Sequence, residues 1–178
     1  MYFAALLART EDGWEASDTE LDEVETLADL ADLAREASQD DEPVLICIEQ
    51  EGAWFGVVRV DGEEDPRVFV SDAAAAARSS YGEILLTDEL LGREPDAPDD
   101  LDLLVDLDGT EEGEPELAED DDADDAGAGT VPAGPVGDVG LLADFGLDEK
   151  DLLSLTSQDA LGEIADALGC TDMLEAVR

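Results

Sequence analysis

Arginine and aromatic residues recur in two neighbouring apolar segments, and these side chains are the ones most suited to chemistry in this sequence. The segment AWFGVVRV contains Trp54 and Arg59, and the segment PRVFV contains Arg67 and Phe69. If the segments pair as antiparallel strands across DGEED, Arg59 lies opposite Arg67 and Phe69 lies on the same face of the sheet. That arrangement favours a small cationic and aromatic patch that binds an anionic group of a partner.

The same arginines also have a purely structural interpretation. Two like charges opposed on neighbouring strands are unfavourable unless an acid lies between them, and carboxylates such as Glu49 are abundant. A register slip of one residue would also separate the patch, because it moves every side chain to the other face. Arg78 follows the second strand closely enough to join the patch. The candidate binding residues are therefore Trp54, Arg59, Arg67, Phe69 and Arg78.

The residue sets that common catalytic mechanisms require are absent from this sequence. Histidine is missing, which excludes Ser-His-Asp and Cys-His catalysis as well as histidine-bound zinc. Neither a P-loop, a dinucleotide-binding glycine motif nor the zinc-deaminase signature is found. The acidic run that begins at Leu104 has Pro115 where a calcium loop requires glutamate. We expect no catalytic residues, no metal site and no cofactor.

The charge of the chain limits its partners. Asp and Glu number 51 against eight Lys and Arg, which gives a formal net charge of −43. Phosphate binding requires Lys and Arg to displace counterions, so we expect no direct binding of nucleic acid, and anionic membrane surfaces are disfavoured for the same reason. A basic protein surface is the expected partner, because opposite charges steer association.

Compartment signals favour the cytoplasm. No apolar run approaches the ~20 residues that a membrane helix requires. The opening MYFAALLA has a short apolar run and lacks the preceding positive charge of a signal peptide. Cys47 and Cys170 lie far apart, without metal-ligand or disulfide spacing, which fits a reducing cytoplasm.

The candidate residues must be positioned by a compact α+β domain, which we predict over residues 1–92. YFAALLA and GWEAS form a hairpin across RTEDG, and VLICIE, AWFGVVRV and PRVFV form three more strands. Ser17 with Glu20 has the spacing of a capping box for a helix whose apolar face begins at Leu21. Ser71 is the expected cap of an alanine-rich second helix, and YGEILL adds a short strand or a turn. The predicted order is β-β-α-β-β-β-α, an antiparallel sheet with two helices, compatible with a profilin-like or longin-like topology.

Residues 93–137 have the composition of a linker. They contain 17 acidic residues together with repeated Gly and Pro, so they bury too little apolar surface to offset chain entropy. We expect an acidic disordered linker. Within it, the segment LDLLVDL has apolar residues at the alternate positions Leu101, Leu103, Val105 and Leu107. It is either an added edge strand, a short docking segment, or an apolar spot in a fluctuating linker.

Residues 138–178 return to an apolar helical pattern. VGLLADFG ends at Gly146, DEKDLLSL follows, and Thr156 or Ser157 caps a helix that ends at Gly169. TDMLEAVR is the last helical segment. Helices this short are not stable alone, so they must pack on each other as a small bundle or on the N-terminal domain.

Three segments together resemble a known family. WFGVVRVDGEEDPRVFVSDAAAAARSSYG, Trp54 to Gly82, resembles the central block of the actinobacterial tRNA adenosine deaminase-associated protein family, and EDPRVFVSDAAA is its most specific part. The opening YFAALLARTEDGWEAS and the closing GLLADFGLDEKDLLSL and EIADALG are similar to that family too. The resemblance therefore covers both ends of the chain, with the acidic segment between them.

The resemblance implies an association and supplies no residue roles. The family takes its name from the deaminase that converts the wobble adenosine of tRNA to inosine, mainly through neighbouring genes, and no catalytic residues are assigned that could be transferred here. It implies a non-enzymatic accessory or regulatory protein that contacts the deaminase through acidic surface. The alternative is a self-associating structural or sensory module, a homodimer through an exposed sheet edge, whose role is unrelated to tRNA.

Overall fold

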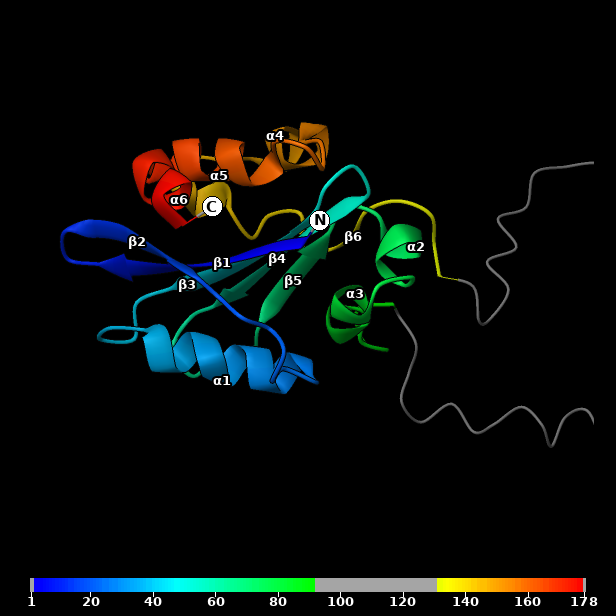
Figure 1. Ribbon diagram of the computed structural model, residues 1–178, viewed down its shortest axis with the longest axis horizontal. Helices are drawn as coiled ribbons and strands as arrows, with labels where there is room; N and C mark the ends of the chain where they lie inside the picture. Colours follow the sequence, from blue (N-terminus) through cyan, green and yellow to red (C-terminus); the bar gives the residue numbers. More distant parts are fainter. Residues whose placement is uncertain (1, 92–130, 178) are drawn as a thin grey trace, which may run out of the picture.

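One antiparallel sheet forms the centre of the molecule. The structure is a computed structural model that describes residues 2–91 and 131–177. Six strands follow the order β2-β1-β3-β4-β5-β6, with α1 on one face and the C-terminal helices on the other (Figure 1). The predicted α+β class, antiparallel sheet and C-terminal helices are confirmed.

The five strands predicted from apolar patterning all form. β1 and β2 make the N-terminal hairpin, and β3 pairs with the other side of β1. β4 and β5 continue the sheet as a second pair of antiparallel neighbours. The bounds are β1 (Tyr2–Thr10), β2 (Gly13–Asp18), β3 (Val44–Gln50), β4 (Trp54–Val60) and β5 (Arg67–Val70).

The first helix begins later than the sequence predicted. α1 spans Leu27–Ala37 and is capped by Thr26, whose hydroxyl accepts a hydrogen bond from the amide of Asp29 at 3.2 Å. The carboxylate of Asp29 accepts in return from the amide of Thr26 at 3.0 Å, which completes a capping box. The prediction that Ser17 caps the helix is wrong, because Ser17 lies in the extended strand β2 opposite Leu6, and the helix begins only at Leu27.

Two short helices follow β5. α2 (Ala73–Ala76) is capped by Asp72, not by Ser71 as predicted, because the Ser71 hydroxyl accepts from the amide of Phe55 at 2.9 Å. The YGEILL segment is neither strand nor turn: it lies in α3 (Ser80–Leu85), capped by Ser79. Gly82 permits this arrangement, since a Cβ there would overlap the backbone carbonyl of Ala76.

The C-terminal part returns to the sheet before it becomes helical. β6, which falls in the interval predicted as linker, pairs with β5. The segment VGLLADFG forms only one 3-10 turn, and the predicted caps Thr156 and Ser157 are wrong, because the helix begins after Asp159. Gly146 and Gly169 adopt left-handed conformations and end their helices as predicted. The bounds are β6 (Val136–Gly137), η3 (Ala143–Phe145), α4 (Glu149–Ser154), α5 (Ala160–Leu168) and α6 (Thr171–Val177).

The sheet has a hydrophobic core on each face, because successive strand residues point to opposite sides. One core packs the sheet against α1, α2 and α3 and contains Leu30, Ile46, Trp54 and Val58. The other packs it against the C-terminal helices: Leu45, Val57 and Phe69 share a cluster with residues such as Leu152, Leu161 and Ile164. The C-terminal helices therefore dock on the N-terminal sheet. Residues 92–130, with the Leu101–Leu107 segment, lie outside the described residues, and the proposed three-segment division stays a prediction.

Candidate functional site

The strand register brings three of the candidate residues to one face of the sheet. Arg59 in β4 lies directly opposite Arg67 in β5, as the sequence predicted. Phe69 pairs with Val57 two positions along, on the same face as the arginines. This is the face that the C-terminal helices cover.

Arg59 is buried beneath the turn that leads into the C-terminal helices. Its Nε donates to the carboxylate of Asp61 at 2.8 Å, and its Nη1 donates to the carbonyl of Leu141 at 2.7 Å and to Asp144 at 3.2 Å. The guanidinium also lies over the Phe145 ring, 4.7 Å from its centroid. Arg59 therefore links residues 141–145 to the sheet through these hydrogen bonds and the ring contact.

Glu49, the carboxylate that the sequence suggested as the neutralising group, lies elsewhere in the same core. Its side chain is buried, and Oε2 accepts from the amide of Leu161 at the start of α5, at 3.4 Å. A carboxylate at this point complements the positive end of the helix.

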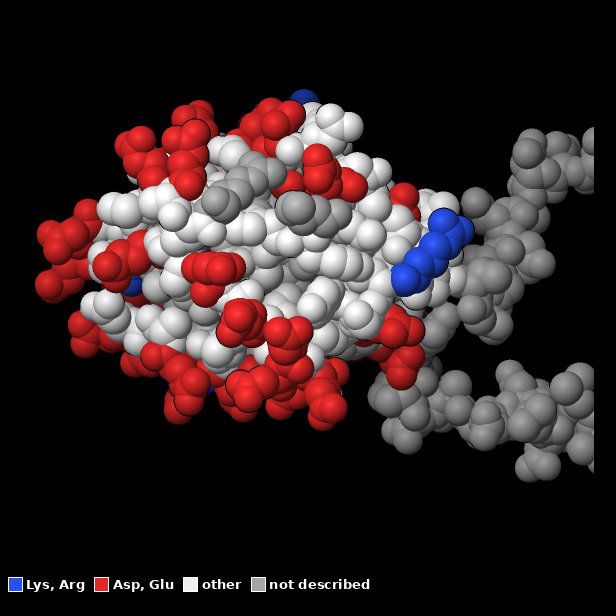
Figure 2. Space-filling view, in the orientation of Figure 1, with Lys and Arg blue, Asp and Glu red and all other residues white. Residues whose placement is uncertain are grey.

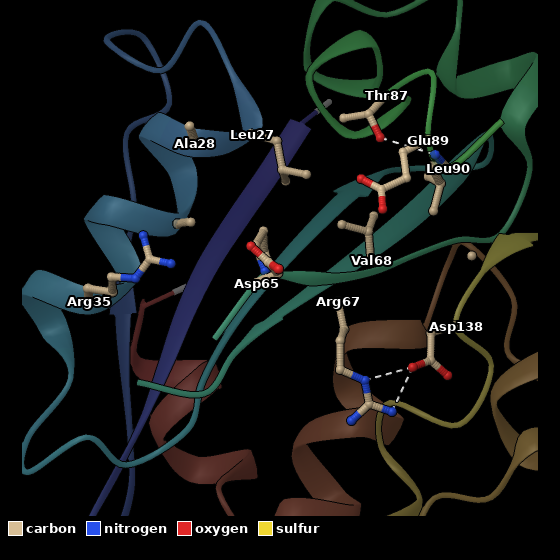
Figure 3. A pocket seen from close by; sticks show the side chains of 13 residues that line it. Leu27, Ala28, Arg35, Asp65, Arg67, Val68, Thr87, Glu89, Leu90 and Asp138 are labelled. Carbon is tan, nitrogen blue, oxygen red and sulfur yellow. Dashed lines mark hydrogen bonds and ion pairs between the residues drawn. The ribbon is translucent and has the colours of Figure 1, made fainter. Parts of the chain in front are cut away.

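Arg67 is paired differently from Arg59. Its guanidinium donates to Asp138 at 2.6 Å, and both side chains remain 39% exposed. The other carboxylate oxygen of Asp138 accepts from the amide of Gly140 at 2.9 Å, and its backbone amide donates to Val68. Arg67 and Asp138 thus join β5 to the segment after β6, at the rim of a groove (Figure 3).

Of the remaining candidates, Trp54 and Arg78 lie apart from the two arginines, whereas Phe69 shares their face of the sheet. Trp54 points to the opposite face, where it is fully buried and its indole donates to Gln50 at 2.8 Å. Phe69 is buried against Phe55, with ring centroids 5.9 Å apart. Arg78 lies in the exposed connection between α2 and α3 and does not line the groove. The structure thus groups three of the five candidates, and their role in binding stays a prediction.

The groove itself was not predicted from the sequence. It has a volume of about 800 Å³ and lies between α1 and the segment that follows α3, beside β5 and β6 (Figure 3). Because its walls come from four separate stretches of chain, no local sequence pattern predicts the groove. Its apolar lining is formed by Leu27, Ala28, Ala31, Val68 and Leu90.

The arginines of the groove already have acceptors. Arg35 on α1 donates from Nε to the carbonyl of Gly62 at 3.1 Å, from Nη2 to the carbonyl of Glu64 at 3.2 Å and from Nη1 to Asp32 at 3.0 Å. Arg67 is paired with Asp138, as described above. The positive charges of the groove are therefore engaged within the fold.

Two carboxylates of the groove are not engaged in this way. Asp65 precedes β5 and Glu89 follows α3, and Figure 3 shows both pointing into the groove from different walls. Within residues 2–91 and 131–177 neither carboxylate has a hydrogen bond or an ion pair. The groove thus combines an apolar lining with two unpaired negative charges.

Both cysteines lie in the described part of the chain, and both are buried. Burial raises the pKa of Cys47 to about 12, with smaller contributions from Cys170 and Glu49, and burial also raises the pKa of Cys170. Both thiols therefore stay protonated near neutral pH, where they are poor nucleophiles. Among the described residues no group of three or more Cys, Asp or Glu is placed to hold a metal ion.

Comparison with known protein families shows to which family this chain belongs. The sequence model of the Rv3753c-like tRNA adenosine deaminase-associated protein family matches residues 2–171. The chain belongs to this family. The resemblance inferred from Trp54 to Gly82 is thereby confirmed, and the match includes the strands, the groove and α5. No curated protein and no solved structure was found to match the chain.

The name of the tRNA adenosine deaminase-associated family describes an association, so the surface of this member is of interest. Figure 2 shows acidic side chains along both margins of one face, over α1 and over the C-terminal helices, and few basic ones. Arg9, Arg35, Arg59 and Arg67 all form ion pairs with acids of the same chain. Among the described helices, none is long and apolar enough to cross a membrane.

Proposed function

We propose that this member of the tRNA adenosine deaminase-associated family is a non-enzymatic accessory or regulatory protein that contacts the deaminase through its acidic surface. The proposal rests on the observation that most basic side chains of the described residues form ion pairs within the chain itself. In the described part of the chain, Arg78 and Lys150 are the basic residues without an ion pair, whereas carboxylates are exposed on both margins of the molecule.

Electrostatics supports a basic protein as the partner. An enzyme that binds tRNA must present Lys and Arg to the phosphates. A chain with a net charge of −43 is attracted to such a surface and repelled by the RNA itself. The protein would thus act in the cytoplasm, on the deaminase and not on the nucleic acid, by shielding the RNA-binding surface, by competing with tRNA or by assisting folding.

The proposal is tested by co-purification of the two full-length proteins across a salt series, with and without tRNA. We expect a complex at low salt that weakens steeply as salt is added, because screening reduces the attraction between exposed charges. tRNA added to the complex should displace this protein from the deaminase. A mixture of tRNA with this protein alone, as the control, should show no binding.

Three outcomes would contradict the proposal or the electrostatic reasoning behind it. The first is the absence of any complex even at low salt. The second is a stable homodimer, seen by light scattering, that does not bind the deaminase. This result would favour the self-associating module instead. Binding of tRNA to this protein alone would also contradict the electrostatic reasoning.

A further inference from the structure

We propose that the groove between α1 and residues 87–90 binds a basic, amphipathic segment of a partner protein, with apolar side chains on its lining and a Lys or Arg between Asp65 and Glu89. The inference rests on the proposed function, since it names the part of the acidic protein that holds the basic partner. It concerns this one groove, so it can fail while the proposed function stands.

The lining of the groove provides room for apolar side chains. α1 contributes Leu27 and the small side chains of Ala28 and Ala31 to the lining, and Leu90 lines the groove from the segment that follows α3. Val68 of β5 is buried at the same place. A volume of about 800 Å³ falls within the range of pockets that take several contiguous groups of a ligand, roughly 300–1,000 Å³.

The hydrogen bonds of the charged side chains that line the groove indicate which charge a bound ligand would carry. All three nitrogens of the Arg35 guanidinium donate to acceptors of the chain itself, and Arg67 donates to Asp138. An anionic occupant would have to displace these acceptors and would then face Asp65 and Glu89. A Lys or Arg side chain meets the opposite situation, because both carboxylates lack a partner among the described residues.

Two carboxylates are too few to bind a free metal ion. Calcium takes six to eight oxygen ligands, and magnesium keeps most of its waters. A lysine or arginine side chain needs only one or two carboxylates, and its aliphatic stem packs on apolar surface such as Leu27 and Leu90. The combination of an apolar lining and two acids without a partner among the described residues therefore fits an amphipathic basic segment, as in other helix-in-groove complexes.

The test uses the full-length protein and a fluorescein-labelled, synthetic Leu/Lys amphipathic helical peptide, with binding followed by anisotropy. The double variant Asp65→Asn/Glu89→Gln removes both charges with almost no change in shape. The matched control Asp151→Asn/Glu163→Gln removes two exposed carboxylates on α4 and α5, so that both variants have the same net charge. We expect the groove variant to weaken binding about tenfold and the control about twofold or less.

A second pair of variants tests the apolar lining. Leu90→Ser introduces a hydroxyl into the groove, whereas Leu153→Ser makes the same change on α4, where Leu153 is 44% exposed. Leu90→Ser should weaken peptide binding and Leu153→Ser should not. Circular dichroism of all four variants confirms that they remain folded.

Three results would overturn the inference. The groove variant and its charge-matched control could weaken the peptide equally, which would mean non-specific attraction. A peptide of residues 101–107 could bind in place of the basic peptide, which would assign the groove to an acidic segment of this chain. In co-purification, the groove variant could bind the deaminase as strongly as the control variant does. The contact with the deaminase would then lie outside the groove, and only the proposed function would stand. Groove-dependent binding of the basic peptide without any deaminase complex would support the inference and count against the proposed function.

Discussion

At the scale of single residues, identical side chains have different roles because their surroundings differ. Arg59 and Arg67 oppose each other on neighbouring strands, yet the Arg59 side chain is 10% exposed and the Arg67 side chain 39%. Arg59 reaches a backbone carbonyl 82 residues away along the chain, that of Leu141. Arg67 makes one ion pair at the rim of the groove. Their contributions to stability should therefore differ.

We expect Arg59→Gln to lower the free energy of unfolding by about 3 kcal/mol, because it leaves Asp61 and the Leu141 carbonyl without their buried donor. The matched change Arg67→Gln should cost at most about 1 kcal/mol, because that pair is exposed and screened. Urea unfolding of the two variants provides the measurement. Equal losses would show that Arg59 does not fasten the C-terminal turn to the sheet.

Cys47 should make the fold sensitive to alkaline pH. Its pKa is about 12 in the folded protein, against an ordinary value of 9.0, so the unfolded chain releases this proton first. Stability from this group is complete below pH 9 and is lost as pH rises toward 12, with a slope of about 1.4 kcal/mol per pH unit. Urea unfolding at pH 8 and pH 10 measures the loss.

The variant Cys47→Ala isolates this contribution from other groups that titrate at high pH. Its stability should fall less between pH 8 and pH 10 than that of the unchanged chain. In the folded chain, both thiols should also react slowly with a thiol reagent at pH 8 and rapidly once urea is added. An identical pH dependence in the variant would contradict the assignment.

At the scale of elements, capping separates helices that look alike in sequence. Three Ser/Thr-x-x-Asp/Glu signatures precede the first helix, at Ser17, Thr19 and Thr26, and only Thr26 is a cap. The deciding factor is β2: residues Gly13–Asp18 pair with β1 as an extended strand, so no helix begins at Ser17. Short helices such as α2 and α3 depend on the same local devices, at Asp72 and Ser79.

Replacement of Thr26 by Ala should cost about 1 kcal/mol of stability, because it removes the hydroxyl that accepts from the amide of Asp29. The control Ser17→Ala lies on an exposed edge strand and should change stability by less than about 0.5 kcal/mol. Thermal unfolding of both variants distinguishes them. A larger loss in the Ser17 variant would restore the helix start that the sequence alone favoured.

At the scale of the whole molecule, the two ends of the chain share one structure. The face of the sheet that includes Leu45, Val57 and Phe69 is covered by the C-terminal helices, and β6 adds to the sheet beside β5. The groove also depends on both ends, since Gly137 and Asp138 line it together with α1. The two segments that the sequence separates are thus packed against each other in space.

A chain that ends at residue 137 should therefore not fold as the intact protein does. Without residues 138–178 the apolar face of the sheet loses its cover, and Arg59 loses the carbonyl of Leu141 and the carboxylate of Asp144. We expect strong binding of a hydrophobic dye and a broad, non-cooperative urea transition. A sharp transition with no dye binding would instead support an independent domain over residues 1–92.

The sequence by itself was enough to predict β1 to β5, the α+β class and the C-terminal helical segments, because alternation and helical spacing are local properties. Family membership also followed from contiguous residues, Trp54 to Gly82. Prediction failed at Ser17, Ser71 and YGEILL, where two local signals competed and sheet pairing or packing selected one of them.

Only the tertiary structure decided which charges are free. Whether an arginine serves a partner or the fold depends on the acceptors that distant segments bring within about 3 Å of it, as Leu141 does for Arg59 and Asp138 for Arg67. The carboxylates of Asp65 and Glu89, which have no partner among the described residues, do not differ in the sequence from any other acid. They stand out because the packing of α1, β5 and residues 87–90 places them in one groove with apolar and charged walls. Hydrogen bonding is set by proximity in space rather than along the chain.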